Sequence, residues 1–491
     1  MSIPKSLSSL QSRTVRNISY IGASQLLVLL LSLLTITVLT RVLTPEDFGV
    51  VSIGLIFMAL FTTIQDFGIS PAVIQRDTRI NESISAGLTL RWTIAAILLV
   101  SLVLLSSSIA GFFGTDAVRP VLIVMSANLF IQPLAFSSYV LLNRDLRFSC
   151  LAVGSVVQYA VMAVVAITLA LFGFSYWSIV FGSLSGSASY VVVLNFYERA
   201  FHKPSMDTAL MKELVRFGTH LLITGLMAYV IFNVDQMVVG KVLGIVVLGI
   251  YFVAIRFGRT LGEQISGTAN RVLFPTMARI KDSIEHLKVG YVQSLRMISI
   301  IAVPLSIGIS ALAPLFVKIV LGKDFADAVM PIAILSFQGL LNALIPPAAN
   351  VLISIGKPKY MSMQATVQAA ILVAAIYPVA LYTGINGVCV LTTMLSLGVL
   401  VYFLVVFSKI FKSRMIEIAK PMGPPLLSGF VTYVVLLLLV QASPFNVLAL
   451  VALPLIGTGV YFSALHISSG GRDVRDLVGL VRESFIKRQG V

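Results

Sequence analysis

Four ionisable side chains interrupt an otherwise apolar stretch of the sequence, and together they could bind a charged substrate. They are Asp235, Arg256, Arg259 and Glu263. The last three are spaced i, i+3 and i+7, so they share one face of a helix. Ionisable groups at membrane depth are costly and normally face a partner, a cavity or a substrate. The two arginines make this stripe a candidate anion-binding site.

The same four residues also allow a purely structural interpretation. Asp235 lies about as far before the turn of a predicted helical hairpin as Arg256 lies after it, so the two could pair. Such a pair would only hold the hairpin together. One Asp and one Glu against two Arg leave no net charge, so an anion site requires further cations. A third role for Asp235 and Glu263 is coupling transport to H⁺ or Na⁺.

Other charged residues could complete a site or close it. Arg91 is the best additional cation, roughly 10 Å into its span at ~1.5 Å per residue, although its long stem could also carry the charge back to the lipid headgroups. Asp66, near the inner end of the second span, could close the cytoplasmic side by pairing with a basic loop, or simply be solvated. Arg41 and Lys241 lie at the outer mouth, where they could form a gate or anchor the helices at the interface.

The elements that must position these residues are transmembrane helices. The chain has 491 residues, of which 58% are hydrophobic and 11% charged, with a mean hydropathy of +0.98. Soluble proteins carry about a quarter charged residues, and apolar runs of about 20 residues, long enough to cross a bilayer, recur along this sequence. The composition therefore predicts an all-α polytopic membrane protein with about fourteen spans.

The predicted spans and loops divide the chain into five parts. They are 1–197 with spans 1 to 6, a basic cytoplasmic linker at 198–216, 217–408 with spans 7 to 12, 409–468 with the last two spans, and a basic amphipathic tail at 469–491. Most of the 35 Lys and Arg lie on the side that holds both termini, which places both termini in the cytoplasm. The net charge of +15 is thus a topology signal, and we expect no nucleic-acid partner.

No motif for catalysis or metal binding stands out in the sequence. The two cysteines, Cys150 and Cys389, lack the spacing of a metal site. No catalytic triad, HExxH or Walker motif is present, and no loop is long enough for a catalytic domain. We therefore expect no catalytic residue, no metal and no cofactor.

Short matches between the two halves indicate an internal repeat. Arg41-Val42-Leu43, followed by Gly49, recurs 200 residues later as Lys241-Val242-Leu243 followed by Gly249. Each copy would hold six spans, an even number, so both would insert in the same orientation. The interface between such parallel repeats commonly holds the substrate. Asp235 and Arg256 correspond to uncharged residues in the first copy, which favours a site-specific role over a packing role.

Five short motifs occur together along the sequence: Leu43-Thr44-Pro45-Glu46-Asp47-Phe48-Gly49, Asp66-Phe67-Gly68, Asn143-Arg144-Asp145-Leu146-Arg147-Phe148, Val234-Asp235-Gln236 and Leu248-Gly249-Ile250-Tyr251. Together they resemble the Wzx-like polysaccharide exporters of the multidrug/oligosaccharidyl-lipid/polysaccharide (MOP) flippase superfamily. The sequence is especially similar to exporters that serve succinoglycan or colanic acid. The resemblance implies two six-helix lobes around a central cavity, plus two C-terminal helices.

The resemblance also implies a function in the bacterial inner membrane. Such exporters move undecaprenyl-pyrophosphate-linked oligosaccharides to the periplasmic leaflet by alternating access, and often line their cavity with arginines that contact the pyrophosphate. By segment, the matching positions here are Arg91, Arg256 and Arg259. Expected partners are the lipid-linked oligosaccharide, membrane lipid, and the polymerase and chain-length or export machinery. The alternatives are a multidrug/cation antiporter or a lipid II flippase of the same superfamily, and a membrane-embedded glycan polymerase or ligase.

Overall fold

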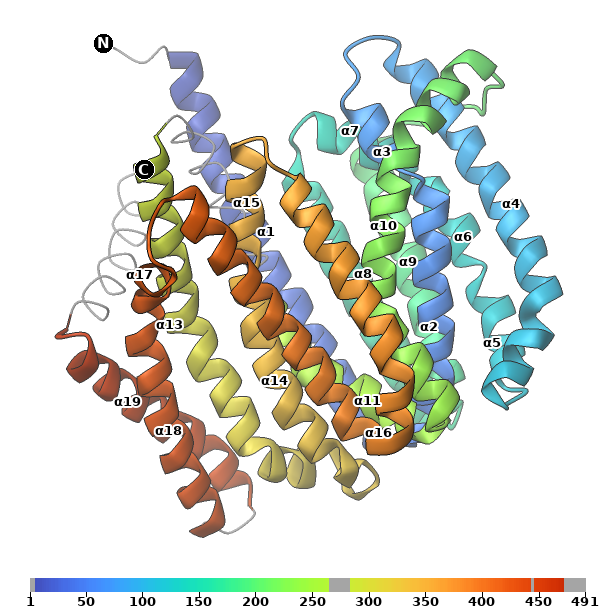
Figure 1. Cartoon of the computed structure of the whole chain (residues 1–491). Helices are drawn as coiled ribbons and strands as arrows, with labels where there is room; N and C mark the ends of the chain where they lie inside the picture. Colours follow the sequence, from blue (N-terminus) through green and yellow to red (C-terminus); the bar gives the residue numbers. More distant parts are fainter. Residues whose placement is uncertain (1–4, 265–282, 443–445, 472–491) are drawn as a thin grey trace. The chain divides into compact units, whose positions relative to one another are not determined.

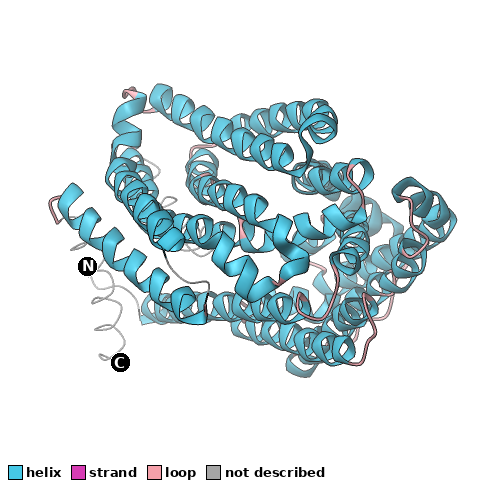
Figure 2. Ribbon diagram, turned by 90° about the horizontal axis from the view of Figure 1, so that it is seen from below, coloured by secondary structure: helices cyan, strands magenta, loops and turns pink. Residues whose placement is uncertain are grey.

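The protein is helical throughout the residues that its computed structural model describes, which are 5–264, 283–442 and 446–471. Figure 2 shows helices and loops and no strand in these residues. Thirteen of the described helices are long and apolar enough to cross a membrane. This confirms the predicted all-α polytopic membrane fold. The part of the predicted tail beyond residue 471 lies outside the described residues.

The described residues form thirteen membrane-length helices, and the sequence predicts about fourteen spans. The longest helix, α16 (Lys359–Ile410), accounts for this difference. Its 52 residues would extend ~80 Å as one rod, more than twice the hydrocarbon thickness. Gly384 inside it has φ 64° and ψ −158°, which is not a helical conformation. The chain therefore breaks there, and α16 comprises two membrane-length helices.

Contacts divide the chain into two units. The first contains residues 1–252 and 373–382, and the second contains 253–372 and 383–491. The helices of the first unit are α1 (Lys5–Leu39), α2 (Pro45–Asp66), α3 (Ile69–Ile74), α4 (Ile80–Phe113), α5 (Val118–Met125), α6 (Asn128–Ile131), α7 (Phe136–Arg144), α8 (Phe148–Leu171), α9 (Trp177–Tyr197), α10 (Thr208–Val242) and the first part of α11 (Ile245–Phe257) (Figure 1). Those of the second unit are α13 (Ile284–Phe316), α14 (Val329–Leu344), α15 (Pro346–Ser354), most of α16, α17 (Met415–Ala419), α18 (Gly423–Ala442) and α19 (Val447–Ser468).

The predicted division at 198–216 stays a prediction, but the structure refines what that segment is. Helix α9 ends at Tyr197, and α10 begins at Thr208, so the second half of the predicted linker is already helical. Asp207 sets this start, because its side chain accepts a hydrogen bond from the Leu210 backbone N–H at 3.0 Å. Aspartate at this position satisfies one of the unpaired N–H groups of the first helical turn.

Local interactions set the start of helix α2. The Thr44 hydroxyl accepts from the Asp47 backbone N–H, and an Asp47 carboxylate oxygen accepts from the Thr44 N–H at 2.9 Å. This reciprocal arrangement satisfies two N–H groups at once. Pro45 occupies the first helical position, where its missing N–H costs nothing.

Two glycines allow α2 and α11 to cross with their backbones in contact. A methyl group on Gly49 would lie 2.1 Å from the Ile245 carbonyl oxygen, and one on Gly249 would lie 1.8 Å from the Pro45 carbonyl oxygen. Both pairs of corresponding residues, 45 with 245 and 49 with 249, are 200 positions apart. The contact is therefore reciprocal, as expected for corresponding segments of a sequence repeat that are related by a two-fold axis. This geometry supports the predicted repeat, whose full organisation stays a prediction.

Candidate functional site

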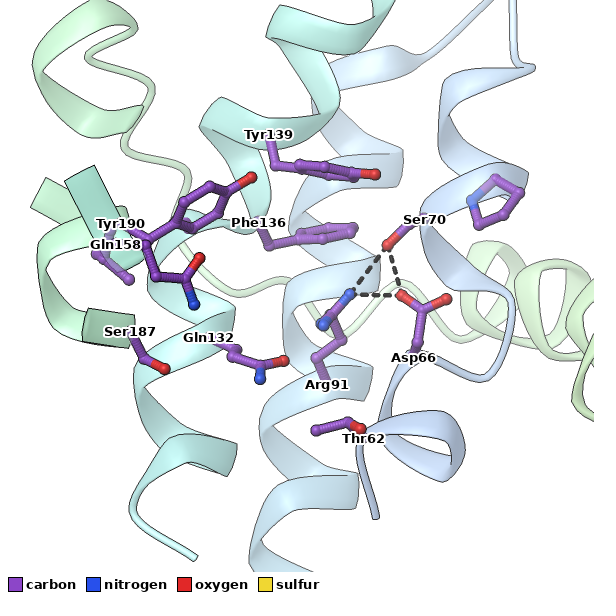
Figure 3. A pocket seen from close by; sticks show the side chains of 13 residues that line it. Thr62, Asp66, Ser70, Arg91, Gln132, Phe136, Tyr139, Gln158, Ser187 and Tyr190 are labelled. Atoms are coloured by element: carbon purple, nitrogen blue, oxygen red, sulfur yellow. Dashed lines mark hydrogen bonds and ion pairs between the residues drawn. The ribbon is translucent and has the colours of Figure 1, made fainter. Parts of the chain in front are cut away.

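A cavity of about 490 Å³ lies inside the first unit, lined from α2, α3, α4, α7, α8, α9 and the short 3₁₀ helix η1 (Gln132–Ala135) that precedes α7 (Figure 3). This volume falls in the ~300–1,000 Å³ range of small-molecule sites. Its walls combine an arginine–aspartate pair, aromatic rings, glutamine amides and hydroxyl groups. Such a polar lining inside membrane-length helices makes the cavity a candidate functional site.

A break between α2 and α3 places Asp66 on the cavity wall. Phe67 and Gly68 both have left-handed backbone angles, φ 44° and 68°, which end α2 at Asp66 and restart the chain as α3. Gly218 of α10 packs against this turn, where an added methyl group would lie 1.9 Å from the Phe67 carbonyl oxygen. After the turn, the Ser70 hydroxyl donates back to Asp66 Oδ1 at 2.5 Å.

Arg91 of α4 is the cation of the cavity. Its Nη1 donates to Asp66 Oδ1 at 2.7 Å and to Ser70 Oγ at 3.0 Å (Figure 3). Its guanidinium carbon lies 5.0 Å from the centre of the Phe136 ring, a cation–π distance. Arg91 is 8% exposed, so its side chain is buried among protein atoms. Within the described residues, its Nε has no hydrogen-bond partner.

Close packing of α8 against α9 forms the opposite wall. A methyl group on Gly186 would lie 2.8 Å from the Gln158 carbonyl oxygen, so only glycine permits this approach. The contact brings Gln158 of α8 together with Ser187 and Tyr190 of α9, and all three side chains line the cavity (Figure 3). The sequence analysis missed these uncharged residues. The pair Gly182 and Gly186, at the small-xxx-small spacing of closely packed membrane helices, was the signal that could have located them.

Asp235 is fully buried and has a partner that the sequence analysis did not identify. The Tyr251 hydroxyl donates to Asp235 Oδ2 at 2.9 Å, and the Gln236 backbone N–H donates to Oδ1 at 2.8 Å. Tyr251 is itself fully buried. These bonds stabilise a carboxylate that would otherwise be costly at this depth. The pairing of Asp235 with Arg256 stays a prediction.

Of the predicted stripe in the second unit, the structure brings Arg259 and Glu263 together. Arg259 is 6% exposed, and its Nε lies 3.5 Å from Glu263 Oε1. Asn342 of α14 donates to the same oxygen at 3.0 Å. A methyl group on Gly262 would lie 2.3 Å from the Gly339 backbone, so this glycine allows α14 to approach. Asn342 is thus a further polar residue of this cluster, and Arg256, on the same stretch, is half-buried.

The two basic residues predicted at the outer mouth differ in their surroundings. Lys241 donates to the Phe112 carbonyl oxygen at 2.7 Å and lies 4.5 Å from the centre of the Phe112 ring. That carbonyl belongs to the last turn of α4, where a cation is favoured by the helix dipole. Arg41 is exposed in the turn between α1 and α2. A gating role for either residue stays a prediction.

No group of three or more potential metal ligands occurs among the described residues, and both cysteines are buried. The acidic side chains of the three polar clusters, Asp66, Asp235 and Glu263, are engaged by arginine, serine, tyrosine or asparagine. The chemistry available at these clusters is therefore reversible binding by charge and hydrogen bonds.

Comparison with known sequences identifies relatives across most of the chain. The profile of a family described as polysaccharide biosynthesis protein matches residues 38–330, more than half of the chain. The lipopolysaccharide biosynthesis protein WzxC of Escherichia coli (strain K12) is 24% identical over 352 residues, which cover 70% of this chain and 71% of that protein. The succinoglycan biosynthesis transport protein ExoT of Rhizobium meliloti (strain 1021) is 25% identical over 338 residues, 68% of each.

Solved structures with similar folds are membrane transporters. A lipid II flippase, MurJ, in an inward closed conformation superposes with a TM-score of 0.77 over 93% of this chain and 99% of its own, at 15% identity. An inward-facing multidrug resistance MATE family transporter of the MOP superfamily gives a TM-score of 0.60 over 81% of this chain and 99% of its own, also at 15% identity. At such identities the likeness shows the fold alone.

Proposed function

We propose, because this chain belongs to the polysaccharide biosynthesis protein family, that it moves undecaprenyl-pyrophosphate-linked oligosaccharide repeat units across the bacterial inner membrane. It acts as a transporter and not as an enzyme, and its product feeds the assembly of an exopolysaccharide or related surface polysaccharide. Relatives named for lipopolysaccharide and succinoglycan biosynthesis support this proposal. Both termini lie in the cytoplasm, and polymerase and chain-length or export machinery take up the product on the far side.

One observation carries this proposal: arginines and polar groups are buried in helices that are otherwise apolar. Arg91 and Arg259 are both less than a tenth exposed. The proposed substrate has a charged diphosphate, a polar glycan and a lipid tail. Buried arginines and amides replace the water that the first two parts lose on leaving the aqueous phase. The tail needs no such replacement, because it can stay in the bilayer.

We assign roles to the charged residues on this basis. Arg256, Arg259 and Arg91 bind the substrate, Asp235 and Glu263 are charge partners or ion-coupling groups, and Asp66, Arg41 and Lys241 contribute to gating. The contact of Glu263 with both Arg259 and Asn342 supports its role as a charge partner. The hydrogen bond from the Tyr251 hydroxyl to Asp235 stabilises that buried carboxylate in a similar way.

Deletion of the protein tests the function directly. Surface polysaccharide should be lost, and lipid-linked oligosaccharide should accumulate on the cytoplasmic leaflet. Undiminished polymer in a strain without a second exporter contradicts the proposal. Unchanged polymer with new sensitivity to cationic dyes supports the multidrug/cation antiporter instead, and accumulation of lipid II supports the lipid II flippase.

Arg256 tests the binding role within that function. Arg256→Ala should stop export while the protein still accumulates, and Arg256→Lys should restore only part of it, because a point charge lacks the bidentate fork. If Arg256 only neutralises Asp235, the double change Asp235→Asn with Arg256→Gln should restore both abundance and export. That result would remove Arg256 from the binding site.

A further inference from the structure

We propose that the cavity of the first unit, described above around Arg91, binds neutral sugar rings of the transported oligosaccharide. The inference rests on the proposed function and assigns one part of the substrate to one site. The pyrophosphate then binds elsewhere, and this cavity recognises the glycan. Three properties of the cavity lead to this assignment: its charge, its unused hydrogen-bonding groups and its aromatic rings.

The charge of the cavity fits a neutral ligand. Its two ionised side chains, Arg91 and Asp66, form one ion pair at 2.7 Å and cancel. A pyrophosphate that reached Arg91 would lie against the Asp66 carboxylate, and an organic cation would meet the guanidinium. A sugar hydroxyl suits both partners, because it donates to a carboxylate oxygen and accepts from an arginine N–H.

The Arg91–Asp66 pair also keeps hydrogen-bonding atoms that can bind sugar hydroxyls. Arg91 and Ser70 both donate to Asp66 Oδ1, and Oδ2 has no hydrogen-bond partner in the described part of the chain. The Asp66 side chain is 36% exposed, so this oxygen is reachable. The Nε of Arg91 is buried and also has no hydrogen-bond partner within the described residues. A buried donor without a partner is costly, and a ligand oxygen would relieve that cost.

The wall opposite Asp66 offers neutral donors and acceptors of the same kind. The side chains of Gln158, Ser187 and Tyr190 line the cavity from α8 and α9, and Gln132 joins them (Figure 3). None of these four side-chain polar groups has a hydrogen-bond partner among the residues that the structure describes. An amide offers both a carbonyl oxygen and an NH₂ group, so this wall can pair with hydroxyls in either direction.

Aromatic rings supply the apolar part of the contact. Phe136, Tyr139 and Tyr190 line the cavity beside the polar groups. A pyranose ring has a face of C–H groups and an edge of hydroxyls, so it needs an aromatic surface and hydrogen-bonding groups together. Phosphate does not use the aromatic surface, and a lipid tail does not use the amides. The combination therefore selects a sugar from the three parts of the substrate.

The test compares two lipids on purified protein in nanodiscs. One is undecaprenyl pyrophosphate, and the other is the lipid-linked oligosaccharide extracted from the parent strain after its polysaccharide polymerase has been deleted. Tyr190→Phe removes one hydroxyl and keeps the ring, and Gln158→Leu removes the amide. Each should weaken binding of the oligosaccharide-bearing lipid about 5-fold, the effect of one hydrogen bond, and leave binding of undecaprenyl pyrophosphate unchanged. Tyr382→Phe, whose side chain is largely exposed, is the matched control and should change neither affinity.

The outcomes separate the inference from the function on which it rests. If wild-type protein prefers the oligosaccharide-bearing lipid and both variants keep that preference, the sugar site is wrong and the proposed function stands. Equal weakening for both lipids also overturns the sugar site, because the residues would then serve the pyrophosphate or the fold. If wild-type protein binds neither lipid, both proposals fail. The oligosaccharide released from its lipid should compete for binding to wild-type protein and less well for the variants, which shows that the sugar itself is recognised.

Discussion

Replacing Gly249 by alanine should destabilise the protein through the crossing of α2 and α11. The added methyl carbon would lie 1.8 Å from the Pro45 carbonyl oxygen and 2.9 Å from the Gly49 backbone nitrogen. These are backbone atoms, so no side-chain rotation relieves the overlap, and the helices must separate by more than 1 Å to reach an ordinary contact of 3.4 Å. Overpacking of this kind costs about 1–3 kcal/mol or more. The higher helix propensity of alanine offsets about 1 kcal/mol.

The control is a helical glycine with open space around it. Gly398 in α16 has no atom within 4 Å of an added methyl group, so Gly398→Ala should leave stability unchanged or raise it. The free energy of unfolding of both variants and the wild type can be measured by denaturant titration in mixed micelles. We expect Gly249→Ala to lose about 2 kcal/mol relative to Gly398→Ala. Equal stability of the two variants would refute the reasoning.

The double variant tests the reciprocity of the crossing. Gly49→Ala introduces the corresponding overlap with Ile245, at 2.1 Å. One separation of the helices would relieve both overlaps, so the double variant should lose less stability than the two single variants together. Additive losses would show that the two contacts are independent, and the two-fold relation would lose its energetic support.

Three further predictions address charge and topology. Asp66→Asn should destabilise the protein more than Arg91→Met, because the arginine is the more buried partner and breaking a buried pair costs ~3 kcal/mol; equal losses in denaturant titrations would contradict this. The Leu210 N–H, followed by Arg79, lowers the pKa of Asp207 below its usual 3.8, so its stabilisation is present above that value and is lost as pH falls through the lower folded-state pKa. When the pH is lowered from about 5 to about 3, the free energy of unfolding of Asp207→Asn should therefore fall by less than that of the wild type. An equal fall in the two proteins would show that Asp207 does not contribute to the acid sensitivity. An alkaline-phosphatase fusion after the C-terminal residue should be inactive, since we expect that terminus in the cytoplasm, and an active fusion would reverse the topology.

Local patterns in the sequence predicted the helices well. Hydropathy predicts the membrane-length segments because each must bury about 20 apolar residues in lipid. The start of α2 follows from Thr44, Pro45 and Asp47 alone, since capping involves residues within one turn. The break at Gly384 similarly falls at a glycine whose backbone angles exclude a helix.

The cavity could not be predicted in the same way, because its contacts join distant residues. Asp66 and Arg91 are 25 positions apart and meet only through the tertiary packing of α2 with α4. Gln158 and Tyr190 carry no charge, so a search for isolated charges in apolar spans does not select them. Arg256 and Arg259, by contrast, are conspicuous as isolated charges, and their roles as substrate ligands stay predictions.

The cancellation of charge between Arg91 and Asp66 has an electrical consequence for transport. Carrying one elementary charge across a membrane potential of 100 mV involves ~2.3 kcal/mol of work. The cavity that holds this pair carries no net charge, so its movement through the field when empty involves no such work. The diphosphate of a bound substrate is negative, and a potential that is negative inside favours its outward movement. In the proposed cycle, voltage therefore acts on the diphosphate, which binds outside this cavity, and the cavity with its neutral sugar adds no voltage dependence to the loaded or the empty step.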